Sequence, residues 1–460
     1  MAKVSRSAVR RQARAIPRIN FESNHEPRLT SFAGLVLFQA FFSQLRLKAR
    51  LASCFPRNAA SGIYARATLF LQLIVHLLLG FRELRDCRYY KDDPLVQRIL
   101  GLKRIPDIAT LSRMLKGATK ETVDKLRRLL RDMVLERLIK LRPARLTLDF
   151  DGSVQSTRRR AQGTAVGFNK KRKGARSYYP LFCTIAQTGQ VFDVLHRPGN
   201  VHDSNGAAAF ILDCVAAIRR DLPDVIIEVR MDSAFFSDKL IKTLTTARVE
   251  FSISVPFERF VELKGMIERQ QCWQRLDDET SYFERLWKPK SWEQTYRFLF
   301  IRTQVKKQIK GPIQLDLFVP HEVGYEFKVI ITNKSLGASS VVTYHEGRGS
   351  QEATFGELKT SFHVGYVPVR RLHGNQLYLL AGLFAYNLTR ELQMRTTAPT
   401  RGTTPGRASL WTFERVETVR KSLIQRAGRL TRPQGVLTLT ISSGEWIKER
   451  FMDLLHSLAA

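Results

Sequence analysis

The sequence predicts an α/β protein built on a mixed β-sheet, with a helical region before the sheet and a small module of helix and strand after it. Apolar residues recur at helical spacing between residues 29 and 141. From Arg145 the pattern changes, and Leu146, Leu148 and Phe150 alternate with polar residues as they do in a strand. This change of period marks the boundary between a helical domain and a sheet domain.

Composition and charge indicate a folded chain with a polyanionic partner. The 460 residues are 44% hydrophobic and 25% charged, which is ordinary for globular domains. The charge is not ordinary, because 75 Lys and Arg against 42 Asp and Glu leave a net charge of +33. Such an excess favours nucleic acid as the partner.

The cysteines and the apolar runs indicate the cellular compartment that is expected for the protein. The five cysteines show no C-x-x-C spacing, so neither a disulfide framework nor a structural zinc site is indicated. The longest apolar run, about residues 69–81, is shorter than the ~20 residues that a membrane span needs, and the N-terminus lacks an apolar signal core. We therefore expect a cytoplasmic protein without membrane contact.

The N-terminal part divides into a basic arm, residues 1–28, and a helical DNA-binding domain, residues 29–141. Within 107–141 a short helix, a break at Gly117 and a long basic helix resemble a helix-turn-helix. Phosphate contacts are then expected from five basic residues of the long helix, Lys120, Lys125, Arg127, Arg128 and Arg131. The alternative is an ordinary helical bundle with a solvated charged face.

The order of elements after residue 142 predicts a ribonuclease-H-like core. Three strands, of which the last two form a hairpin around Gly189, are followed by helix, strand, helix and strand up to residue 256. Residues 257–333 are predicted as a β-rich insertion, which includes a strand at "IQLDLFVP". The core resumes at 334–395, and 396–460 are a Thr/Pro/Gly-rich linker and a C-terminal α+β module.

Acidic residues at strand ends suggest two-metal phosphodiester chemistry. Asp149 and Asp151 lie on the polar face of the first strand, and Asp232 ends the strand that neighbours it in a ribonuclease-H-like sheet. Converging carboxylates of this kind hold pairs of Mg²⁺ ions. An isolated aspartate at a strand end is otherwise often a turn residue. Whether Asp149 shares in metal binding stays open.

A third carboxylate is expected from "YHEGRGSQEATFGELK". At 100° per residue, Tyr344, Arg348, Glu352 and Lys359 fall within one narrow helical stripe, whereas Glu346 and Glu357 lie on the opposite side. The stripe selects Glu352 as the ligand, with cations on either side of it for phosphate oxygens. The alternative is a surface ion-pair ladder.

These residues resemble the DDE transposases of bacterial insertion sequences, in the group with a β-strand insertion and a Y-R-E-K signature. The resemblance covers about Arg145 to Arg395 and rests on "LTLDFDGS", "GNVHDSNGA", "VRMDSAFFS", "YHEGRGSQEATFGELK" and "LLAGLFAYNLTREL". In one respect the sequence departs from the family, because three residues instead of two separate Tyr344 from Arg348.

The resemblance implies cut-and-paste transposition by a metal-dependent enzyme. Asp151, Asp232 and Glu352 would hold two Mg²⁺, for which Mn²⁺ could substitute. Tyr344, Arg348 and Lys359 would contact DNA, and Trp292 or Trp287 of the insertion would stack on a flipped base. The implied partners are the terminal inverted repeats, target DNA and a second copy of the chain, in the nucleoid of a bacterium. The alternatives are a structure-specific ribonuclease-H-like nuclease and a non-catalytic DNA-binding derivative.

Overall fold

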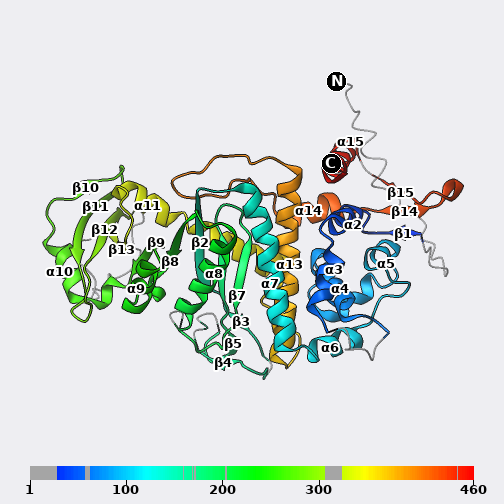
Figure 1. Ribbon diagram of the computed structural model, residues 1–460, viewed down its shortest axis with the longest axis horizontal. Helices are drawn as coiled ribbons and strands as arrows, with labels where there is room; N and C mark the ends of the chain where they lie inside the picture. The colour runs from blue at the N-terminus through cyan, green and yellow to red at the C-terminus, as the bar shows by residue number, and fades with distance from the viewer. Residues whose placement is uncertain are drawn as a thin grey trace, which may run out of the picture.

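A large mixed sheet forms the centre of the protein (Figure 1). The structure, a computed structural model, describes residues 28–56, 63–158, 160–167, 169, 172–202, 205–305, 324–442 and 444–459. Within these residues nine strands form one sheet. Their order across it is β7 (Val191–Leu195), β6 (Leu181–Ile185), β2 (Arg145–Gly152), β8 (Ile226–Met231), β9 (Glu250–Val255), β13 (Tyr325–Thr332), β12 (Tyr296–Gln304), β11 (Thr280–Trp287) and β10 (Gln274–Arg275).

The first five strands of this order have the ribonuclease-H-like arrangement. β2, β8 and β9 are parallel neighbours, while β6 and β7 form an antiparallel hairpin beside β2. The predicted fold class is thereby confirmed. The apolar side chains of β2 (Leu146, Leu148 and Phe150) share a buried core with helices α8 (Ala207–Asp221) and α9 (Asp238–Thr246). A small sheet, in the order β3 (Gln155–Ser156), β5 (Arg176–Tyr178) and β4 (Ala165–Val166), follows β2.

The insertion strands continue the same sheet. β13 pairs antiparallel with β9, and β12, β11 and β10 extend the sheet from there. Helix α10 (Val261–Arg269) precedes these strands, and its Leu263 and Ile267 join the core of the central sheet. The strand predicted at 313–320 lies outside the described residues, as does the basic arm up to residue 27.

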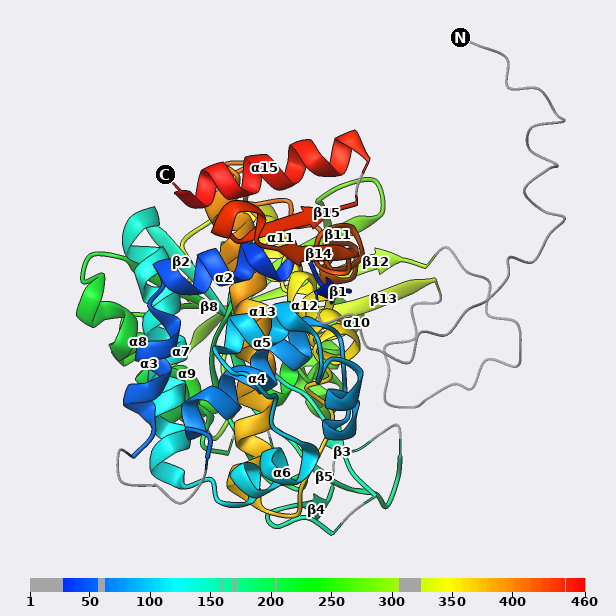
Figure 2. The ribbon, with the colours of Figure 1, turned by 90° about the vertical axis from the view of Figure 1, so that its right-hand side faces the viewer.

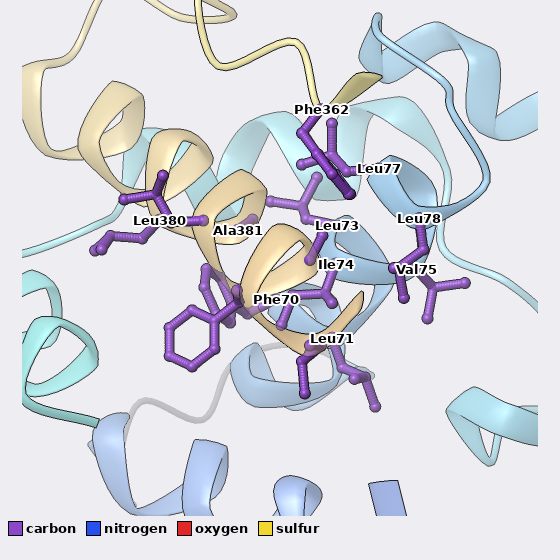
Figure 3. Close-up of a cluster of buried hydrophobic side chains, with 14 of the residues drawn as sticks. Phe70, Leu71, Leu73, Ile74, Val75, Leu77, Leu78, Phe362, Leu380 and Ala381 are labelled. Carbon is purple, nitrogen blue, oxygen red and sulfur yellow. The ribbon is translucent and has the colours of Figure 1, made fainter. Parts of the chain in front are cut away.

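The helical region shares one core with the late helix α13 (Leu372–Thr396). Figure 3 shows Phe70, Leu73 and Ile74 of helix α4 (Arg66–Leu78) against Leu380 and Ala381 of α13, with Phe362 beside them. Burying these apolar faces stabilises both elements by about 25 cal/mol for each Å² removed from water. The remaining α-helices here are α2 (Leu35–Gln44), α3 (Leu47–Cys54), α5 (Pro94–Leu100), α6 (Ile108–Lys116) and α7 (Lys120–Leu141).

The two ends of the described chain lie together. β1 (Leu29–Thr30) pairs with β14 (Gly428–Thr431), which pairs with β15 (Thr438–Ile441). Helix α14 (Val416–Val419), the π-helical turn Arg420–Ile424 and the last helix, α15 (Glu445–Ala459), complete this C-terminal part (Figure 2). None of the helices that the structure describes is long and apolar enough to cross a membrane.

Candidate active site

Asp151 and Asp232 occupy corresponding positions on adjacent parallel strands. The register pairs Asp149 with Arg230, and Asp151 and Asp232 each follow two residues later, with Asp232 just past the end of β8. Adjacent strands are about 4.8 Å apart, so two side chains on the same face there are neighbours. Asp232 follows the end of β8, where its carboxylate caps the turn Ser233–Phe235 by accepting from the Ala234 N–H at 3.0 Å. The sheet therefore brings two of the three predicted carboxylates to one edge.

Helix α12 (Gly349–Ser361), which carries the third predicted carboxylate, begins against β2. The Gln351 side chain donates from Nε2 to the Asp149 carbonyl at 2.8 Å, and Arg348 Nη1 lies 3.6 Å from Asp151 Oδ2. Glu352 is four residues after Arg348 and thus lies one helical turn away on the same face. Its side chain is exposed, and no three acidic, His or Cys side chains among the described residues form a metal-binding group. Glu352 therefore does not complete a metal site with the two aspartates in this conformation.

Asp149 has a structural partner. Arg230 donates from Nε and Nη2 to the two carboxylate oxygens of Asp149 at 2.6 and 2.8 Å, and both side chains are buried. The remaining Arg230 nitrogen, Nη1, donates to the backbone carbonyls of Tyr344 and Gly406. Because both Asp149 oxygens are engaged by this guanidinium, Asp149 is a buried ion-pair residue in this conformation rather than a metal ligand.

Tyr344 is buried between three cations. Its ring centre lies 4.2 Å from Lys334 Nζ, 5.2 Å from the Arg230 guanidinium and 5.7 Å from that of Arg407. Burial raises the pKa of its hydroxyl well above the usual value. Since none of its surface is exposed, the predicted DNA contact of Tyr344 is not possible in this conformation. Such cation–π contacts strengthen when they are desolvated, so Tyr344 joins the strands to helix α11 (Ala338–Glu346) instead.

Glu228 completes this buried polar layer below the aspartates. It accepts from Lys334 Nζ at 2.6 Å, Arg407 Nε at 2.5 Å and Thr147 Oγ1 at 2.7 Å. Burial by itself would raise the pKa of Glu228, but the hydrogen bond from Arg407 and the charge of Lys334 lower it to about 2. The stability that this carboxylate contributes is therefore present above its ordinary pKa of 4.5 and is lost as the pH falls toward 2.

Comparison with known families identifies the chain. Residues 18–460 match the family described as transposase DDE domain group 1. The chain belongs to this family. The resemblance to DDE transposases seen in the sequence motifs is confirmed.

Solved transposase complexes show distant similarity to this DDE-family chain. One is the piggyBac transposase synaptic complex with hairpin DNA, at 12% identity over 85% of this chain and 80% of that chain, with a TM-score of 0.43. Another is the Mos1 transposase paired-end complex with the left transposon end, at 13% identity over 43% and 60%, with a TM-score of 0.17. No curated protein matches the chain.

The long basic helix of this DDE-family chain, α7, is buried along one face. α7 contributes buried residues both to the N-terminal helical core and to the core under the sheet. Arg127 and Arg131, expected at phosphates, bind the buried Asp193 carboxylate of β7 at 2.8 and 2.9 Å. Lys125 pairs with Glu121 at 2.6 Å, and Arg128 is exposed. Arg127 and Arg131 are thus used in internal packing, whereas Lys120 and Arg128 are exposed and their contact with DNA stays a prediction.

Trp292 is part of the hydrophobic core. It is 8% exposed and stacks on Phe236 with ring centres 4.9 Å apart. The predicted stacking of Trp292 on a flipped base would require it to leave this contact. Lys359, the last residue of the predicted stripe, lies exposed near the end of α12. Of the predicted DNA contacts, Lys359 and Arg128 are exposed and Arg348 and Lys125 are partly exposed, whereas Tyr344 and Trp292 are buried.

The sequence analysis missed the cations of the buried layer. Arg230, Lys334 and Arg407 surround Tyr344 from three separate segments. One signal was present for Arg230, because Glu228, Arg230 and Asp232 alternate along β8 and must share a face. No local pattern could have placed Arg407 there.

Gly347 and Gly349 are a natural pair for testing the junction between α11 and α12. A Cβ atom on Gly347 would lie 1.8 Å from the Gly406 carbonyl oxygen and 2.3 Å from Arg230 Nη1, whereas one on Gly349 meets nothing within 4 Å. We expect Gly347→Ala to lower the free energy of unfolding by about 2 kcal/mol, and Gly349→Ala to change it by less than about 1 kcal/mol. Urea unfolding of both variants measures this, and equal stabilities would contradict the close packing.

Proposed function

We propose that the chain is the DNA transposase of a bacterial insertion sequence, which binds terminal inverted repeats and performs cut-and-paste cleavage and strand transfer. The observation that carries the proposal is the position of Asp151 and Asp232 at the ends of neighbouring parallel strands, with Glu352 one helical turn from the residue that contacts Asp151. Membership of the DDE family and the net charge of +33 support it.

The donor set fits divalent metal ions with a preference for oxygen ligands. Asp151, Asp232 and Glu352 would together hold two Mg²⁺ or Mn²⁺ ions, provided that the exposed Glu352 side chain turns toward the strands. When bound, the two ions activate the attacking hydroxyl and stabilise the leaving oxygen. The buried layer of Asp149, Arg230 and Glu228 keeps the strand ends rigid, which favours a preorganised site.

The protein's own groups orient the DNA. In the first step the oxygen of water forms a bond to phosphorus, and the 3′-oxygen at the element end leaves as a hydroxyl. In the second step the oxygen of this 3′-hydroxyl forms a bond to phosphorus in a phosphodiester of the opposite strand or of target DNA, and the 3′-oxygen of the attacked strand leaves as a hydroxyl. Arg348, which lies against Asp151 in the free protein, would move to the non-bridging phosphate oxygens, where a guanidinium binds in bidentate fashion. Two element ends must be joined in one reaction, so we propose that a pair of chains acts together.

The test is the incubation of end-labelled DNA carrying both element ends with the full chain and Mg²⁺. We expect cleavage at the inverted repeats, loss of cleavage with EDTA, and loss in Asp232→Asn but not in Asp278→Asn, which alters an exposed insertion residue. Cleavage of branched DNA regardless of the repeats would favour a structure-specific nuclease. Binding to the repeats without any metal-dependent cleavage would favour a non-catalytic derivative.

A further inference from the structure

The helix that carries the third predicted carboxylate, α12, is packed firmly on one side only. Its Phe355 lies against Phe182 of β6, with ring centres 5.2 Å apart. On another side α12 borders a cavity of about 460 Å³, which is also lined by Thr184 of β6 and by Phe413 of the segment after α13. Because the described side chains do not fill this space, packing alone does not fix the rotation of α12 about its own axis, and polar contacts must contribute.

Glu357 makes two of these polar contacts at the wall of the cavity. Its Oε1 accepts from the Val416 N–H at 2.7 Å, and its Oε2 accepts from Arg390 Nη2 at 2.5 Å. The side chains of Glu357 and Arg390 are only 13% and 11% exposed. Val416 is the first residue of α14, where a backbone N–H has no partner within its own helix. Glu357 therefore ties α12 to both α13 and α14.

The end of α12 is tied to the same part of the chain. The buried guanidinium of Arg420, in the π-helical turn that follows α14, donates from Nη2 to the Ser361 carbonyl at 3.0 Å. The same group donates to the Leu77 and Leu78 carbonyls at the end of α4, at 3.2 and 2.8 Å. The beginning of α12 is tied to β2 instead, by the side chain of Gln351. The C-terminal part of the chain thus contacts α12 along its second half.

The rotation of α12 decides where Glu352 lies. Glu357 follows Glu352 by five residues, so the two side chains are about 140° apart around the helix axis. A carboxylate about 6 Å from this axis moves by about 2 Å when the helix turns by about 20°. Mg²⁺ accepts oxygen ligands only close to about 2.1 Å. A small rotation of α12 is therefore enough to decide whether Glu352 can share metal ions with Asp151 and Asp232.

We propose that Glu357 is a positioning residue of the catalytic site, which sets the rotation of α12 and through it the distance from Glu352 to the two aspartates. The inference rests on the proposed function and deepens it. Glu357 is itself neither a metal ligand nor a DNA contact, because both of its oxygens are engaged by protein donors. The C-terminal part of the chain thereby controls the third carboxylate, although it lies outside the sheet that carries Asp151.

A single backbone N–H can be removed to test this. Val416→Pro deletes the donor to Glu357 and suits the backbone, because proline is favoured at the first position of a helix. The preceding Arg415 is extended, with φ −61° and ψ 139°, as a residue before proline requires. The matched control is Val416→Ala, which shortens the same buried side chain and keeps the N–H. The two variants thus differ in the contact to Glu357 rather than in the loss of valine packing.

The measurement is Mn²⁺ binding by the full chain, followed by the electron paramagnetic resonance signal of the free ion. We expect Val416→Pro to weaken Mn²⁺ binding by at least about tenfold and to raise the Mg²⁺ concentration for half-maximal cleavage by a similar factor. Val416→Ala should resemble the unchanged protein in both. Affinity for labelled element ends in EDTA should be the same in all three proteins, because the deleted contact is made to α12 rather than to DNA.

A second pair of variants covers the case that Val416→Pro does not fold. Glu357→Ala should reproduce the loss of Mn²⁺ affinity, whereas Glu417→Ala, which removes an exposed glutamate at the same cavity, should not. Equal Mn²⁺ affinities within either pair, or a fall in thermal stability without a change in Mn²⁺ affinity, would overturn the positioning role while cleavage by the unchanged chain still supports the proposed function. An unchanged chain that neither binds Mn²⁺ nor cleaves DNA would remove the proposed function and this inference with it.

Discussion

Asp151→Asn is expected to abolish DNA cleavage while leaving the fold and DNA binding intact. The Asp151 side chain is about 20% exposed at a strand end, and its partner Arg348 can turn to solvent. An amide in place of the carboxylate weakens the hold on a divalent ion, so single-turnover cleavage of labelled element ends should fall by at least about 1,000-fold. Thermal unfolding followed by circular dichroism should show little change.

Glu352→Gln provides the companion measurement. We expect the same loss of cleavage, because the side chain makes the third carboxylate of the proposed site. If Glu352→Gln still cleaves, the third ligand moves to the exposed Glu346. Glu357 is an unsuitable substitute, since it is bound to Arg390 and to the Val416 N–H. Normal cleavage by Asp151→Asn would contradict the site as a whole.

Asp149→Asn is expected to have the opposite effect, although Asp149 is only two residues away. It removes the charge that compensates the buried Arg230, and breaking a buried ion pair from one side costs about 3–5 kcal/mol. Urea unfolding should therefore show a large loss of stability, with cleavage retained at low temperature by the molecules that remain folded. A stable Asp149→Asn variant without activity would instead make Asp149 a metal ligand.

The sequence was sufficient to predict the strands of the core and the positions of Asp151 and Asp232 along neighbouring strands. Strict alternation in Arg145–Gly152 predicted that Asp149 and Asp151 share a face, and the element order placed Asp232 on the neighbouring strand. The same alternation could not predict that the polar face of β2 is largely buried. A polar face is ordinarily expected to meet water, whereas here it is covered by Tyr344, Gly406 and Arg407, whose contacts span more than 100 residues of sequence.

The basic helix α7 shows the same limitation in another form. Its arginines have the spacing of an exposed face, and a sequence cannot distinguish an arginine facing DNA from one facing an internal carboxylate. Asp193, the partner of Arg127 and Arg131, is more than 60 residues away. Trp292 shows the same limitation, because the sequence around an aromatic residue of an insertion does not distinguish a ring that packs on Phe236 from one that stacks on a base.

The segment after α13, expected to be a linker, passes back over the sheet and supplies partners to Arg230 and Glu228. A premature stop codon upstream of Gly406 would leave these two buried charges short of partners in the translated product. The fold of the catalytic domain in the shortened polypeptide would then be destabilised, although only the tail is missing. We therefore expect such truncated alleles to yield unstable products that are degraded, rather than inhibitors that compete with the intact protein for its recognition sites.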